Sequence, residues 1–118
     1  MIPRTLLLSV TLACSLFAAD ATVEAAKKNI AAKKYDEAIT QLEKAKPSPE
    51  VKKTLADAYL AKADSMMYND ALPPRVKYPG ALKAYREVLK YDKDNKKAKE
   101  NIASIEGIYK SMGRPIPQ

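Results

Sequence analysis

Apolar residues recur along this chain at the spacing of an α-helix. From Tyr35 to Ala45 they stand at relative positions 0, 3, 4, 7 and 10, and from Ala98 to Met112 at 0, 4, 7, 11 and 14. Such spacing places them on one stripe of a helix with 3.6 residues per turn. No stretch alternates with a period of two, and the chain has only 3 Gly. These patterns predict an all-α fold.

Prolines and polar turns divide the chain into five expected helices. Proline fits the first turn of a helix but not its interior, so Pro47-Ser48-Pro49 ends one helix and opens the next. By the same argument Leu72-Pro73-Pro74 ends the third helix, and Gly113 ends the last. The expected helices are 21–32, 35–46, 50–69, 79–91 and 95–112, with a loop over 70–79 and an extended tail over 114–118. Short links between successive helices predict tandem antiparallel helical hairpins.

The first 21 residues have the three parts of a secretory signal peptide: a basic start at Arg4, an uncharged apolar run and small residues at its end. The run from Thr5 to Ala19 is shorter than the roughly 20 residues that cross a bilayer comfortably. We therefore expect cleavage, after Ala21 or after Ala19, rather than a permanent anchor.

Cys14 offers a different interpretation of the same segment, in which its thiol is acylated and becomes the first residue of a lipoprotein. The residues before it are Thr11-Leu12-Ala13, and such a motif has an aliphatic residue where Thr11 stands. Cys14 is better explained as one apolar residue of the signal run. The sequence thus predicts a periplasmic or secreted protein with no cysteine left for a disulfide.

The charge balance is basic. The chain has 21 Lys and Arg against 14 Asp and Glu, a net charge of +7, and removal of residues 1–21 takes one charge of each sign. A basic protein attracts acidic partners over long range. For an exported protein these are acidic proteins, anionic envelope polymers or lipid head groups, and nucleic acid is not expected. Four lysine pairs, at 27–28, 33–34, 52–53 and 96–97, are interleaved with acids, which is typical of solvated helix faces.

The chain has few of the side chains that enzymes commonly use for catalysis. The chain has no His, and its one Cys lies in the expected signal peptide. Most nucleophilic, general-base and zinc chemistry depends on those side chains. We therefore expect no enzyme activity, no metal site and no cofactor. Asp92 and Asp94 are interpreted as turn residues, because no further calcium ligand follows at usable spacing.

Self-comparison of the helices reveals a degenerate repeat. Tyr35-Asp-Glu-Ala38-Ile39 aligns with Tyr78-Pro-Gly-Ala81-Leu82, and Leu55-Ala56-Asp-Ala-Tyr59 has a large–small pair followed by an aromatic residue. These positions resemble the tetratricopeptide repeat, a 34-residue helix–turn–helix family. The resemblance implies a repeat domain over 22–113, with about two degenerate repeats and a C-terminal capping helix. Ala38 and Ala81 are 43 residues apart, nine more than one repeat.

Members of this family usually bind peptides or proteins on the surface lined by the first helix of each pair. The resemblance therefore implies a partner-binding surface that includes Lys53, Asp57, Leu60, Lys97 and Asn101. Some members hold a peptide carboxylate with Lys, Asn and Arg side chains. Lys53, Lys97 and Asn101 match that clamp only in part, because Asp57 stands where an Asn would be wanted.

The expected loop over 70–79 is a second candidate contact. Arg75, Lys77 and Tyr78 lie between prolines that limit the conformations of the loop, which would preorganise a contact surface. Alternatively, the prolines only separate two helices while Leu72 and Val76 fix the loop to the core. Of the seven tyrosines, Tyr68 and Tyr91 are the ones expected to be exposed.

Two functions are compatible with the sequence. The first is a non-catalytic adaptor of the cell envelope that binds a protein or peptide partner, with self-association as one form of this. The second is a basic module that docks on an anionic envelope polymer or a membrane surface through its lysines.

Overall fold

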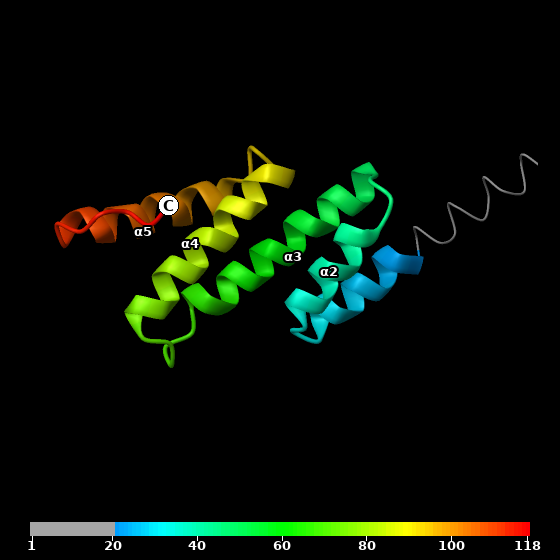
Figure 1. Cartoon of the computed structure of the whole chain (residues 1–118), viewed down its shortest axis with the longest axis horizontal. Coiled ribbons are helices and arrows are strands. Elements are labelled where there is room, and N and C mark those ends of the chain that lie inside the picture. The colour runs from blue at the N-terminus through cyan, green and yellow to red at the C-terminus, as the bar shows by residue number, and fades with distance from the viewer. Residues whose placement is uncertain (1–20) are drawn as a thin grey trace, which may run out of the picture.

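The computed structural model describes residues 21–118, so all but the last residue of the expected signal peptide over 1–21 lies outside the described residues. The first helix covers residues 21–31, followed by α2 (Tyr35–Lys44), α3 (Pro49–Met67), α4 (Pro74–Tyr91) and α5 (Lys96–Ser111). Consecutive helices lie side by side and run in alternating directions (Figure 1). Within residues 21–118 all regular structure is helical. The predicted all-α arrangement of antiparallel hairpins is confirmed.

The helix ends follow the expected local chemistry. The hydroxyl of Ser48 accepts a hydrogen bond from the Val51 N–H at 3.1 Å, and Pro49 occupies the first turn of α3. The side chain of Asn95 accepts from the Ala98 N–H at 2.9 Å and begins α5. Gly113 adopts a left-handed conformation with φ of 66° after α5, which glycine reaches without steric cost.

The start of α4 differs from the prediction. Residues 74–79 are the first turns of α4 rather than a loop, and the link between α3 and α4 is only 68–73. Pro73 is extended and its carbonyl accepts from the N–H groups of Val76 and Lys77, both at 2.9 Å. Pro74 then fits the first turn, as Pro49 does. Pro79 lies inside the helix, where it has no N–H to donate to the carbonyl of Arg75.

The core consists of two clusters of buried side chains. The N-terminal cluster joins the helix over 21–31, α2 and the first half of α3, and includes Val23, Leu42 and Leu55. The C-terminal cluster joins the rest of α3 to α4 and α5, and includes Tyr85 and Ile105, both 0% exposed. The terminal methyl group of Met66 on α3 packs over Gly80 of α4, in the space that a Cβ would take.

Tyr59 and Tyr91 belong to both clusters. Their rings stack with centroids 5.9 Å apart and planes 9° from parallel. Tyr91 is therefore partly buried, and the prediction that it is exposed was wrong, whereas Tyr68 is 61% exposed as expected. The reason is that the Tyr91 ring, at the end of α4, stacks on Tyr59 of α3, a contact between helices that the spacing within one helix does not specify.

The tail after Gly113 is non-helical, as predicted, and it packs back on the domain. Ile116 is partly buried against the C-terminal cluster. Arg86 of α4 donates a hydrogen bond from Nη1 to the carbonyl of Pro117 at 2.7 Å.

Candidate partner-binding surfaces

A cluster of polar side chains joins α3, α4 and α5. The Tyr85 hydroxyl donates to Asp64 Oδ1 at 2.6 Å, and Lys97 Nζ donates to Asp64 Oδ2 at 2.7 Å. Asn101 Nδ2 donates to the Tyr85 hydroxyl at 2.8 Å and to the Tyr68 hydroxyl at 3.4 Å. Of the residues proposed from the sequence, Lys97 and Asn101 thus meet in one network, with three partners that the sequence analysis did not select.

The one carboxylate of the network, Asp64, is matched by the one ammonium, Lys97. Burial and the hydrogen bond to Asp64 raise the pKa of Tyr85 above its usual value, so this hydroxyl stays protonated. The Asp64 hydrogen bond also raises the pKa of Lys97. The Lys97 ammonium lies 5.7 Å from the centroid of the exposed Tyr68 ring. Because Lys97 is already paired, it offers an incoming carboxylate less attraction than a free lysine would.

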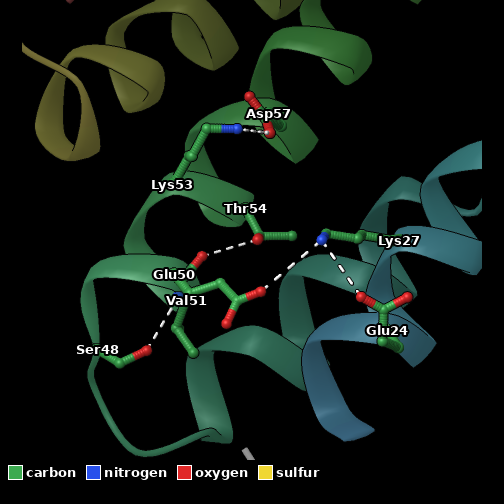
Figure 2. A network of polar contacts seen from close by, with 8 residues as sticks. All are labelled: Glu24, Lys27, Ser48, Glu50, Val51, Lys53, Thr54 and Asp57. Carbon is green, nitrogen blue, oxygen red and sulfur yellow. Dashed lines mark hydrogen bonds and ion pairs between the residues drawn. The ribbon is translucent and has the colours of Figure 1, made fainter. Parts of the chain in front are cut away.

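Lys53 and Asp57 lie one turn apart on the exposed side of α3. Their side chains form an ion pair at 3.4 Å, with 79% and 55% of each side chain exposed. Figure 2 shows this pair beside a second network, in which Lys27 lies between Glu24 at 3.3 Å and Glu50 at 3.8 Å. Leu60, the third proposed residue of α3, is partly buried against the C-terminal cluster. Lysines on this face are therefore largely paired with acids of the same chain.

The proposed residues of the expected loop lie on α4 instead. Arg75 is exposed, whereas Lys77 and Tyr78 are partly buried and Tyr78 packs against the C-terminal cluster. Their arrangement is fixed by the helix and not by a proline-restricted loop. Within residues 21–118 no hydrogen bond or ion pair joins them to the Lys53–Asp57 pair or to Lys97 and Asn101, and none joins those two sets to each other, so these proposed residues form three separate groups.

A hollow in the described part of the chain lies elsewhere, where α2 ends, α3 begins and α4 ends. We call it the junction groove; its volume is about 740 Å³. Leu42, Val51 and Leu55 form its floor and are themselves at most 5% exposed. Its accessible apolar surface comes from Ala45, Pro47, Pro49 and Tyr91, and its charged lining residues are Glu43, Lys52 and Lys90.

The sequence analysis did not select the junction groove as a site. Its floor residues belong to the apolar stripes, which indicate core. The available signal was the Pro47-Ser48-Pro49 segment, which contributes three residues to the lining of the groove.

Among residues 21–118, no group of three acidic, His or Cys side chains is placed to hold a metal ion. No helix in this range is both long enough and apolar enough to cross a bilayer. Comparison of the chain with protein-family models, curated proteins and solved structures found no match.

Proposed function

We propose that this chain is a non-catalytic protein-binding module, an exported adaptor of tetratricopeptide-like type that holds a segment of a protein partner. The observation that supports the proposal is the junction groove. It is an open apolar hollow at the meeting point of three helices, and its volume of about 740 Å³ lies in the range of typical ligand sites. Apolar surface gathered in one concave place is the usual property of a binding site.

The rigidity of the scaffold adds to this support. Ser48 caps α3 at the edge of the groove, and the stacked rings of Tyr59 and Tyr91 hold the end of α4 against α3. A partner would therefore meet a preformed surface, and little conformational entropy would be lost on binding.

The alternative function is a basic module that docks on an anionic polymer or membrane surface. The net charge of +7 favours it. The ion pairs of Lys27, Lys53 and Lys97 weaken it, because these lysines are already matched by acids of the chain itself.

Panning of a random peptide library on the purified chain tests the proposal. Selected peptides should bind with micromolar affinity, and binding should persist when NaCl is raised from 50 to 500 mM, because apolar contacts are not screened. Dextran sulfate and phosphatidylglycerol vesicles serve as comparison ligands. If the panning selects no peptide and only these anions bind, with steep loss in salt, the alternative function is correct.

A further inference from the structure

We infer that the surface between α4 and α5 is a second binding site, which takes an extended segment with an aliphatic side chain between two prolines. The tail over 114–118 occupies this site in the isolated chain, and a partner segment of the same chemistry would displace it. The residues of the described range that hold the tail do not line the junction groove, so the inference goes beyond the proposed function.

The tail is held by an apolar anchor and a backbone hydrogen bond. It leaves α5 at Gly113 and runs back along that helix (Figure 1). Ile116, between Pro115 and Pro117, is partly buried against the C-terminal cluster. Arg86 Nη1 donates to the carbonyl of Pro117 at 2.7 Å. Proteins commonly bind extended peptides in this way, with backbone hydrogen bonds for affinity and a seat for a side chain for specificity.

The donor of that hydrogen bond is positioned by the helices themselves. Arg86 Nη2 of α4 lies 3.8 Å from Glu106 Oε1 of α5, and the two side chains are 33% and 32% exposed. A guanidinium has five N–H donors in a planar arrangement, so one nitrogen can face a carboxylate while the other binds a carbonyl. Because the ion pair does not involve the tail, Arg86 remains oriented when the tail leaves.

The apolar part of the site is also built without the tail. Tyr85 and Ile105 are 0% exposed and pack α4 against α5 in the interior of the C-terminal cluster. The N–H of Arg114 donates to the carbonyl of Tyr109 at 3.0 Å, and beyond Arg114 the tail has a single hydrogen bond within residues 21–118. Release of the tail would therefore break few contacts and would leave a preformed surface for another segment.

The two prolines determine which kind of segment fits. Proline fixes φ at about −65° and disfavours the helical conformation of the residue before it, here Arg114 and Ile116. A segment restricted in this way loses little conformational entropy when it binds. Its carbonyl groups are also free, whereas those inside a helix already accept from N–H groups four residues on. Since Arg86 can only donate, it selects an extended segment over a helical one.

The experiment opens the site with one substitution in the full chain. Ile116→Gly removes the apolar anchor of the tail, and Gln118→Gly, at an exposed position of the same tail, is the matched control. The probe is a synthetic peptide with the sequence of residues 113–118, titrated into each isotope-labelled chain while amide NMR shifts are recorded. Its Kd for the Ile116→Gly chain should be on the order of 1 mM, because one side chain and one hydrogen bond anchor it. The shifts should centre on Arg86 and Glu106.

Competition with the tail gives the second readout. The unchanged chain and Gln118→Gly should bind the probe about fivefold more weakly than Ile116→Gly does, because the tethered tail competes at an effective concentration in the millimolar range. At high probe concentration the amide signals of Arg114 and Gln118 in the unchanged chain should approach those of the released tail in Ile116→Gly.

Altered probes and chains test the chemistry of recognition. A probe that carries Ile116→Gly should bind at least about fivefold more weakly, and one with Ala in place of both prolines should also bind more weakly. Arg86→Ala, introduced into the Ile116→Gly chain, should lower the affinity for the unaltered probe about fivefold or more. Lys96→Ala is its matched control and should bind normally, because it also removes a cation from an ion pair of 3.8 Å, with Glu100.

Circular dichroism checks that each variant is folded, and Ile116→Ser releases the tail by a second route should Ile116→Gly lower the helix content. Absence of saturable binding by both open chains would overturn the inference and leave the tail as a structural cap of α5. Equal affinity of the probe for the unchanged and the open chains would also overturn it, since the probe would then bind elsewhere. Either result leaves the junction groove and its peptide panning unaffected.

Discussion

Replacement of Tyr85 by Phe should destabilise the chain markedly, although it removes a single oxygen atom. The hydroxyl donates to a carboxylate of Asp64 at 2.6 Å and accepts from Asn101 at 2.8 Å, and the residue is 0% exposed. A hydrogen bond to a charged group contributes about 1.5–3 kcal/mol. Asp64 keeps its bond to Lys97 and Asn101 keeps its longer contact with Tyr68, so the expected loss of unfolding free energy is about 2 kcal/mol.

The assay is urea unfolding followed by circular dichroism, with thermal melting as a second measurement. For a domain of this size, about 2 kcal/mol corresponds to a fall in Tm of about 10 °C. Tyr109→Phe is the matched control: this ring also packs on the C-terminal cluster, but its hydroxyl makes no hydrogen bond within residues 21–118. The control should change stability by less than about 0.5 kcal/mol. Equal stability of the two variants would refute the assigned role of the network.

Three further predictions concern stability. Gly107→Ala should raise the unfolding free energy by about 0.5–1 kcal/mol, because a Cβ at this position of α5 meets no atom within 4 Å. Gly113→Ala should lower the unfolding free energy by a similar amount, because its φ of 66° disfavours a side chain. Chemical denaturation of both variants tests the opposite signs. Ser48→Ala should cost about 1 kcal/mol by removing the cap of α3, and an unchanged urea midpoint would contradict it. Stability should fall as the pH rises above 10, because the raised pKa values of Tyr59 and Tyr85 keep these groups protonated in the folded chain while their unfolded counterparts ionise near 10.0. The slope should approach about 1.4 kcal/mol per pH unit for each tyrosine and should be smaller in Tyr85→Phe, as unfolding measured from pH 8 to 11 would reveal.

The order and type of the helices could be predicted because local signals determine them. The apolar stripes, the Ser48 and Asn95 caps and the Gly113 terminator act within a few residues, and each lies where the periodicity indicates. The start of α4 could not be predicted in the same way. Two adjacent prolines end one helix and begin the next equally well. In the structure α4 begins at Pro74 and Tyr78 packs against the C-terminal cluster, a contact that the local sequence does not specify.

Only part of the polar network, Lys97 and Asn101, was predicted from the sequence. Lys53, Asp57 and Leu60 stand at helical spacing, and the next positions of the same stripe are Asp64 and Tyr68. Extension of that stripe would have identified both of them. Tyr85 offers no such signal, because 21 residues separate it from Asp64 and its stripe position indicates an ordinary core aromatic. The junction groove likewise depends on how three helix ends meet, which no single segment of the sequence specifies.

The stacked rings of Tyr59 and Tyr91 also bear on how the chain unfolds. Each ring packs against both clusters. Unfolding of either hairpin would therefore expose apolar side chains of the other cluster to water. Chains built from serial helical pairs can lose their ends piece by piece. Here the shared rings couple the pieces, so amide protons of α3 should exchange together, through one global opening, rather than in separate steps from each end.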